Sequence, residues 1–530
     1  MHRCLTVLLI VAFFESHLSV EAVNAPPGQT LGQPWPMPQS YQSYPDLLLL
    51  NSATFNLSPV GHSCDILQDA IRRYRLIIFG PSNALKFRPK SNVNVLANLD
   101  VNLMNECEKY PSLEMKENYT LTVTSSTANL ASPTIWGILR GLETFSQLVY
   151  RGNYGEFLLN ATKIVDFPRF SHRGVLLDTS RHYLSKEVIK ENIEAMAYNK
   201  MNVFHWHIVD DQSFPYQSRK YPKLSDEGAY NRFTHIYTQN DVAEIIEFAR
   251  VRGIRVIPEY DTPGHSQSWG KGQKGLLTEC YSQGKPNGNF GPINPIVNTT
   301  YTFLEGFFSE VQQVFPDKYT HMGGDEVSFD CWKSNPDITK FMQQHGFPGN
   351  YSRLEQYYEQ RLLNIMAKLN AGYIIWQEVV DNGVKVRPDT VVEIWKGGYQ
   401  DELAKVTKKG LRTILSSCWY LNYISYGGDW TKYYSCDPWD FEGTAEQKNL
   451  VIGGESCMWG EYVDSTNVIS RLWPRNSAVA ERLWSAQSVK NPDKAKPRIE
   501  ENRCRMIRRG IRAEPLSGPG FCSQEFNSIP

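Results

Sequence analysis

The chain has 530 residues, which is enough for two or three domains or for one large barrel with a smaller companion. Its charges nearly cancel, with a formal net charge of −1 and a pI of about 6.8. This balance excludes a global attraction to nucleic acid or to anionic membranes, and it suits a small neutral substrate better.

The first residues combine a basic start, an apolar run from Leu5 to Phe14 and small residues near Ala22, which predicts a secretory signal peptide over residues 1–22. No later run approaches the roughly 18 apolar residues of a membrane span. Export agrees with ten cysteines that form no CxxC pair, typical of disulfides rather than of a zinc site. Candidate glycosylation sequons occur at Asn56, Asn118, Asn160, Asn298 and Asn350.

Residues 23–168 are predicted to form a smaller N-terminal α+β domain. An extended Pro-rich arm, Asn24 to Pro45, leads into it. Apolar periodicity then predicts a helix after Cys64, strands at 93–103 and 119–124, and a helix at 134–149. We expect a sheet backed by helices that serves as a scaffold.

Residues 169–530 show short apolar runs that alternate about eight times with helical stretches. This pattern predicts parallel βα units that close a (β/α)8 TIM barrel. The expected strands are 175–178, 203–209, 255–259, 319–323, 373–376, 391–395, 412–416 and 451–455. The expected helices include 186–199, 241–252, 301–315, 354–369 and 401–409.

Functional side chains follow nearly every expected barrel strand, where barrel enzymes place their chemistry. Carboxylates alternate there with aromatic rings, a combination that suits a sugar, because its C–H faces pack on indole while its hydroxyls bind charged groups. In chain order they are Asp178, Arg181, Asp210, Asp211, Glu259, Asp261, His265, Asp325, Glu326, Trp376, Glu378, Trp395, Trp419, Tyr420, Trp459 and Glu461.

The segment 321–327 places Asp325 and Glu326 directly after a Gly pair at the expected end of a strand. The two glycines allow positive φ or a close approach of the backbone. Two-carboxylate glycosidases hold their acids roughly 5 Å or more apart, one on each side of the scissile bond. Two residues that are adjacent in the sequence cannot easily take up this arrangement. We therefore expect Glu326 to be the general acid and Asp325 to hold another group in place.

Two other readings remain open from the residues alone. His205 and His207 lie on one side of a strand near Asp210, as in some metal sites, although they can equally be hydrogen-bonded core histidines. A sugar-binding relative without catalysis, or with weak activity, would keep the tryptophans, but the presence of both acids counts against it. The basic run 503–512 is interpreted as a solvated helix face that does not bind nucleic acid.

Four motifs together resemble the family 20 glycoside hydrolases, and within them the β-hexosaminidase subunits of animal lysosomes. They are HRGVLLDTSRH at 172–182, NVFHWHIVDD at 202–211, HMGGDEV at 321–327 and AVAERLW at 478–484. The likeness extends from about residue 35 to residue 526 and includes WGILRGLETFSQ in the first domain.

The resemblance implies an exo-acting, retaining β-N-acetylhexosaminidase that releases terminal β-linked GlcNAc or GalNAc from glycoconjugates or chitin oligomers. The substrate's own 2-acetamido group would be the nucleophile, which removes the need for a second protein carboxylate. Glu326 would protonate the leaving oxygen and then activate water, and we expect its pKa to be raised. Asp325 would orient the acetamide and stabilise the oxazolinium cation.

The same resemblance implies the rest of the sugar site, without any cofactor or metal. Arg181 and Glu461 would hold ring hydroxyls, and Tyr420 would donate to the acetamide oxygen. Trp376, Trp395 and Trp459 would form the walls. The residues that support the acid and the ring would be Asp210, Asp261 and His265.

The resemblance also implies the disulfides Cys64–Cys107, Cys280–Cys331 and Cys504–Cys522, with Cys457 free. Cys418 and Cys436 depart from the mammalian subunits, and we predict an additional bridge that pins the loop carrying Tyr420. At Asn422 and Tyr423 the chain lacks the arginine with which one mammalian subunit binds sulfated sugars. The segment 282–288 differs from one that helps a mammalian subunit to act with a glycolipid activator protein.

The expected partners follow from the family. They are a small carbohydrate or glycoconjugate substrate and a second subunit, identical or related. A glycolipid activator protein is a further candidate. The expected location is the secretory pathway, with the lysosome ahead of the extracellular space and the acrosome.

Overall fold

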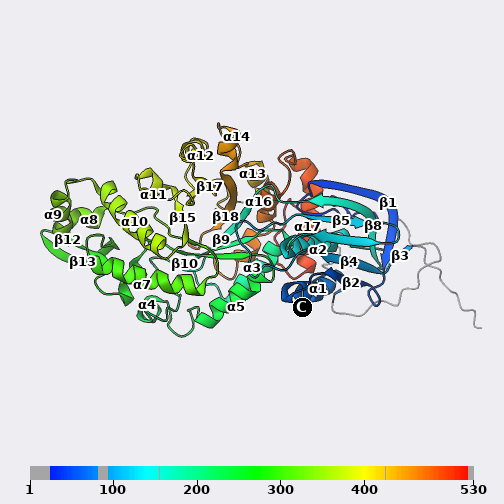
Figure 1. The fold of residues 1–530 in the computed structure, drawn as a ribbon, viewed down its shortest axis with the longest axis horizontal. Helices are drawn as coiled ribbons and strands as arrows, with labels where there is room; N and C mark the ends of the chain where they lie inside the picture. The colour runs from blue at the N-terminus through cyan, green and yellow to red at the C-terminus, as the bar shows by residue number, and fades with distance from the viewer. Residues whose placement is uncertain (1–23, 81–93, 154, 424, 426, 523–530) are drawn as a thin grey trace, which may run out of the picture.

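The computed structural model describes residues 24–80, 94–153, 155–423, 425 and 427–522, so the predicted signal peptide lies outside the described residues. The molecule is elongated, with a closed barrel at one end and an open sheet with its helices at the other (Figure 1). Among the described helices, none is both long and apolar enough to cross a membrane.

The N-terminal sheet has eight strands, and helices α1 (Asp65–Phe79) and α2 (Ile135–Leu148) pack beside it. The hydroxyl of Thr134 caps α2 by accepting from the Gly137 amide, and every residue of α2 is buried. The strand order is β2 (Asn56–Gly61), β4 (Asn98–Leu103), β6 (Ala128–Ser132), β5 (Tyr119–Val123), β8 (Phe157–Asp166), β1 (Ser40–Leu50) and β3 (Asn94–Leu96), and β7 (Tyr150–Arg151) pairs with β8.

The leading arm differs from the prediction at its C-terminal end. Strand β1 already begins at Ser40, and Pro45 is accommodated because the register with β8 shifts between Ser43 and Leu47. Most side chains from residue 40 to 46 are exposed, which explains why no apolar alternation marked the strand. Trp35 is fully buried, and its indole N–H donates to the Ser477 carbonyl at 3.0 Å.

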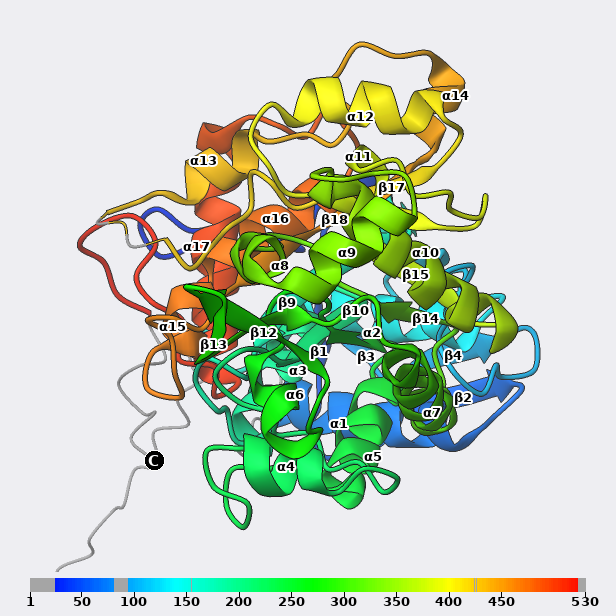
Figure 2. The same ribbon diagram turned by 90° about the vertical axis from the view of Figure 1, so that its left-hand side faces the viewer.

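The second part is a closed parallel barrel, as predicted (Figure 2). Each strand pairs in parallel with the next, and the last, β18, closes the circle on β9. The strands are β9 (His172–Asp178), β10 (Val203–Val209), β11 (Arg255–Tyr260), β14 (Tyr319–His321), β15 (Gly372–Trp376), β16 (Val391–Ile394), β17 (Arg412–Leu415) and β18 (Val451–Met458).

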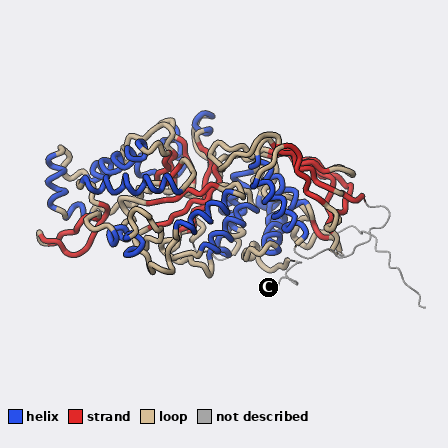
Figure 3. The backbone as a smooth tube through the Cα atoms, turned by 60° about the horizontal axis from the view of Figure 1, so that its bottom comes forward, coloured by secondary structure: helices blue, strands red, loops and turns tan. Residues whose placement is uncertain are grey.

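Helices and loops surround this barrel (Figure 3). The longer helices are α3 (Lys186–Tyr198), α5 (Gln239–Arg250), α7 (Asn298–Val314), α10 (Tyr351–Lys368), α12 (Tyr399–Lys408), α16 (Arg475–Trp484) and α17 (Pro492–Arg508). Shorter elements are α4 (Lys223–Gly228), α6 (Gln267–Gly272), α8 (Asp330–Ser334), α9 (Pro336–Gln344), α11 (Gln377–Asp381), α13 (Trp430–Ser435), α14 (Ala445–Asn449), α15 (Val468–Leu472) and the hairpin β12 (Leu277–Ser282) with β13 (Lys285–Ile293).

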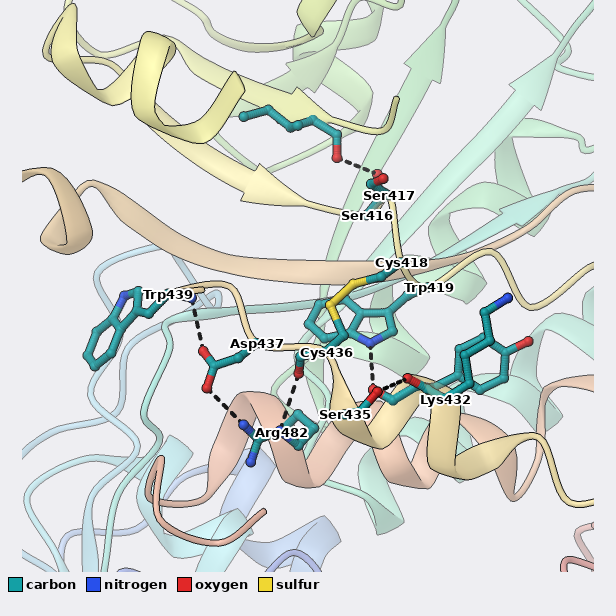
Figure 4. The surroundings of a disulfide bond; sticks show 12 residues. Ser416, Ser417, Cys418, Trp419, Lys432, Ser435, Cys436, Asp437, Trp439 and Arg482 are labelled. Carbon is teal, nitrogen blue, oxygen red and sulfur yellow. Dashed lines mark hydrogen bonds and ion pairs between the residues drawn. A yellow bond between two sulfur atoms is a disulfide. The ribbon is translucent and has the colours of Figure 1, made fainter. Parts of the chain in front are cut away.

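The structure contains four disulfides, which join Cys64 to Cys107, Cys280 to Cys331, Cys418 to Cys436 and Cys504 to Cys522. Cys457 is free and buried. The third bridge ties the loop after β17 to the end of α13 (Figure 4). Next to the bridge the indole N–H of Trp419 donates to the Tyr433 carbonyl at 3.0 Å, which ties the loop to α13 at a second point.

A buried ion cluster joins the N-terminal sheet and its helices to the barrel. Glu117 accepts from Arg140 on α2 at 2.8 Å and from Arg173 on β9 at 2.7 Å. All three side chains are almost completely buried. Although burial favours the neutral acid, the two guanidinium groups hold the pKa of Glu117 below its usual value.

Replacing this carboxylate should weaken the junction strongly. Glu117→Gln leaves two buried guanidinium groups without their counter-charge, and we expect a loss of about 3 kcal/mol in the free energy of unfolding. Urea unfolding followed by fluorescence measures it. Glu114→Gln, at an exposed position nearby, is the matched control, and an equal effect of both changes would contradict the role of Glu117.

Candidate active site

The loop after β14 delivers two carboxylates through an unusual backbone. Gly323 has φ 68° and Gly324 has φ 98°, and a Cβ on Gly323 would lie 1.7 Å from an oxygen of Asp261. Glu326 itself adopts φ 50°, which costs a non-glycine residue about 1 kcal/mol or more. The backbone therefore sends Asp325 inward, where it is buried, and leaves the Glu326 side chain 60% exposed.

Asp325 lies beside a second buried acid, Asp261. The Gly324 amide donates to one oxygen of Asp261 at 2.8 Å, while the other oxygen of Asp261 and Oδ1 of Asp325 are buried without a partner in the described structure. Burial raises the pKa of Asp325, and burial together with the Asp325 charge raises the pKa of Asp261 further. Asp325 therefore offers a buried acceptor that a bound N–H group can use.

Glu326 differs from the expectation that its pKa is raised. The imidazole Nε2 of His265 lies 3.7 Å from Glu326 and 3.7 Å from Asp325. Burial opposes a charge on His265, but its contacts with Asp210 and Glu326 and the nearby acids raise its pKa well above the usual value. This cation lowers the pKa of Glu326, because an exposed carboxylate loses little by being charged.

Arg181 and Asp210 connect this acid pair to the barrel interior. Arg181 donates to Asp178 at 3.0 Å and lies 2.9 Å from Asp210. Asp210 contacts Nδ1 of His265 at 3.3 Å and Nε2 of His207 at 2.8 Å. Although burial opposes it, these partners hold the pKa of Asp210 below its usual range, so the carboxylate is charged.

Four aromatic side chains form a continuous wall at the same end of the barrel. Successive ring centroids are 6.2 to 6.5 Å apart along the contacts Trp395–Trp376, Trp376–Trp459, Trp459–Tyr420 and Tyr420–Trp395. The indole N–H of Trp376 donates to Glu259 at 2.8 Å, and that of Trp395 to Glu378 at 3.0 Å. Buried carboxylates therefore fix the orientation of these two rings.

The other predicted residues are Glu461, Asp211, Trp419 and Glu259, and only Glu461 is exposed. Burial opposes the charge on Arg181, but the nearby acids, Glu461 among them, raise the pKa of Arg181. Asp211 is half-buried and accepts from the Gln267 backbone amide at 2.9 Å. Trp419 is completely buried, so it cannot touch a sugar. Glu259 lies inside the barrel rather than at its rim.

Sequence reasoning missed other charged groups near the acids. Lys396 lies 2.8 Å from Glu378. Glu355 and Glu359 on α10 are buried behind the loop, and both oxygens of Glu359 lack a partner among the described residues. Burial, followed by neighbouring acids, raises the pKa of Glu355 to about 8 and that of Glu359 well above its usual value. No sequence signal distinguishes these glutamates from those of a solvated helix face.

The histidines of the metal hypothesis are engaged with carboxylates. Nδ1 of His205 contacts Glu455 at 2.6 Å, and its Nε2 lies 3.1 Å from Glu259. His207 uses both ring nitrogens, one on Glu259 at 2.6 Å and one on Asp210. Burial opposes charge, yet these carboxylates raise the pKa of His207 to about 9. A protonated imidazole donates from both nitrogens, which is the opposite of a metal ligand.

Comparison with protein families gives two matches along the chain. Residues 170–487 match the catalytic domain of glycosyl hydrolase family 20, and residues 34–148 match the model described as beta-acetyl hexosaminidase like.

Known proteins of similar sequence cover nearly the whole chain. The human beta-hexosaminidase subunit beta is 51% identical over 98% of this chain and 94% of that subunit. The bovine subunit alpha is 53% identical over 93% of this chain and 95% of that subunit.

Solved structures share the fold. A chitobiase from Flavobacterium johnsoniae superposes with a TM-score of 0.79 at 30% identity, covering 90% of this chain and 73% of that one. An exo beta-N-acetylglucosaminidase from Vibrio harveyi, at 22% identity, has a TM-score of 0.76 over 93% of this chain and 80% of that one. The chain therefore belongs to glycosyl hydrolase family 20.

Proposed function

We propose that this protein is an exo-acting, retaining β-N-acetylhexosaminidase that removes terminal β-linked GlcNAc or GalNAc. The observation that carries the proposal is the pairing of an exposed acid, Glu326, with a buried neighbour, Asp325, whose Oδ1 has no partner in the described structure. The free oxygen suits the N–H of a 2-acetamido group, and the exposed acid suits the leaving oxygen. The catalytic unit would be residues 169–530, with residues 23–168 as its scaffold.

In the proposed reaction the acetamide oxygen attacks the anomeric carbon of its own sugar. Glu326 gives its proton to the departing oxygen, and the bond to the aglycone breaks. Asp325 accepts from the acetamide N–H and stabilises the positive charge that develops on the oxazolinium ring. Glu326, now ionised, takes a proton from water as that water opens the ring, so the anomeric configuration is retained.

The other site residues would bind and orient the sugar. Arg181 and Glu461 would hold ring hydroxyls, and Tyr420 would donate to the acetamide oxygen. The rings of Trp376, Trp395 and Trp459 would pack on the sugar faces. Asp210, Asp261 and His265 would keep the acid pair in place through the contacts described above.

The surroundings of the site favour neutral glycans as substrates. Tyr423 is exposed and stacks on Tyr420, with ring centroids 6.0 Å apart, where an arginine would be needed to bind a sulfated sugar.

The relatives named as alpha and beta subunits support a dimer, either with a copy of this chain or with a related subunit. A glycolipid activator protein is a further proposed partner, although residues 282–288 differ from the family segment that acts with it.

The proposed location is the lysosome, reached through the secretory pathway. Four disulfides agree with folding in an oxidising compartment. Asn56, Asn118, Asn160, Asn298 and Asn350 are the proposed glycosylation sites. A general acid with a lowered pKa works best at acid pH, as in the lysosome.

Removing the acid should abolish cleavage of poor leaving groups. Glu326→Gln is expected to lower kcat/KM for a chitobiose substrate at least about 10³-fold, because the leaving alkoxide then departs unprotonated. An aryl substrate with an acidic phenol should lose much less. Asp330→Asn, at an exposed position at the start of α8, is the control. Equal losses on both substrates would contradict the role of Glu326.

The cation on His265 should set the alkaline limit of activity. His265→Gln removes the charge that lowers the pKa of Glu326, so the acid stays protonated to higher pH. The alkaline limb of kcat/KM against pH should therefore move upward while kcat falls. His235→Gln, at an exposed histidine, should leave the limb where it is. A limb that stays fixed in His265→Gln would refute this assignment.

Removal of divalent metal ions distinguishes the proposed metal-free hydrolysis from the metal hypothesis. Dialysis against EDTA is expected to leave the hydrolysis rate unchanged, because His205 and His207 are already bound by carboxylates. Loss of activity that Zn²⁺ restores would favour the metal reading instead.

A further inference from the structure

The basic run at the end of α17 is not the solvated helix face that its sequence suggested. Arg505 and Arg509 have side chains only 4% exposed, and Arg509 donates to buried Glu143 at 2.8 Å. Earlier on the same helix, Arg498 pairs with buried Glu481. The helix therefore neutralises its buried charges with acids at these positions.

Arg505 and Arg508 have no acid within hydrogen-bond distance in the described structure. Arg505 donates its two terminal nitrogens to the backbone carbonyls of Gln147 and Gln33, and its Nε is buried without a partner. The nearest carboxylate oxygen, on Glu501, is 4.0 Å away. Arg508 has neither an ion pair nor a hydrogen bond within the part of the chain that the structure describes.

Both arginines line one cavity of about 490 Å³ between the leading arm, α17 and the β7 turn, by which we mean residues 149–153 and 155. Arg151 lines it too, with its guanidinium packed 3.6 Å from the ring centroid of Phe157. Three arginines and one acid, Glu501, are among the residues that line the cavity, and Arg151 donates one N–H to the Gly155 carbonyl at 3.0 Å. Both oxygens of Glu501 are already used, by the Gly32 amide and the Thr30 hydroxyl.

Burial lowers the pKa of Arg508, and repulsion from Arg509, Arg505 and Arg151 lowers it further. A protein that leaves such charges together gains stability when an anion enters between them. Guanidinium groups bind tetrahedral oxyanions through paired N–H donors. The cavity shares no residue with the candidate active site.

We propose that this cavity is a second binding site, specific for a phosphate or sulfate group and held by Arg508 with Arg505 and Arg151. The bound oxyanion would bridge the arm and the β7 turn to α17. Its occupancy would stabilise the N-terminal part of the chain against α17 without entering the reaction.

Titration of the full-length glycosylated protein tests the site. Isothermal titration calorimetry with inorganic phosphate, inorganic sulfate and glucose 6-phosphate, each at the same ionic strength in chloride, distinguishes the sources of the oxyanion. We expect saturable binding of one anion per chain. Arg508→Gln should weaken it about tenfold or more, since it removes a charge-assisted hydrogen bond to the anion.

The matched control is Arg512→Gln, whose parent side chain is 67% exposed and pairs with Glu191. It should bind as tightly as the parent. Without anion, Arg508→Gln should be at least as thermostable as the parent, because it removes an unpaired charge, and its hydrolase activity should be unchanged. If Arg508→Gln does not fold, Arg151→Gln replaces it.

Two results would overturn the proposal. One is the absence of saturable binding of all three anions by the parent protein. The other is an equal loss of affinity in Arg508→Gln and Arg512→Gln, which would show general attraction to a basic surface rather than a site.

Discussion

The interior of the barrel is organised by contacts between buried imidazoles and carboxylates. Imidazoles and carboxylates alternate from strand to strand, each within hydrogen-bond or ion-pair distance of the next, and the members are His172, Glu455, His205, Glu259, His207 and Asp210. A single buried ion without its partner would cost several kcal/mol. The strands must therefore close in one register, because any slip would leave several of these groups unpaired.

This network ends at the residues that face the acid pair. Asp210 contacts Nε2 of His207 on the side of the barrel interior, and it contacts Arg181 and His265 on the outer side. The position of His265 beside Glu326 thus depends on contacts that extend through the barrel, rather than on its own loop alone. Glu326, strained and exposed, is held near this cation by the Gly323–Gly324 backbone.

The barrel, and the place of Asp325 and Glu326 directly after a strand, can be predicted from the sequence because both leave local signals. Short apolar runs mark the eight strands, and the Gly pair marks the turn before Asp325. The interior network leaves no such signal, since His205 and Glu455 are 250 positions apart and meet only when the register is known. Strand β1 is hidden for a different reason, because its first half is exposed and carries a proline.

The pKa of Glu326 could not be predicted from its proposed role as general acid, because it depends on the charged groups around the side chain. A general acid is expected to have a raised pKa, yet the His265 cation lowers it in the free protein. The two steps of the proposed reaction make opposite demands, since Glu326 must give a proton first and accept one later. A sugar bound over the exposed side chain would remove water and raise the pKa of Glu326 for the first step. When the aglycone leaves, water would return and the His265 cation would favour the carboxylate, which the second step needs as a base.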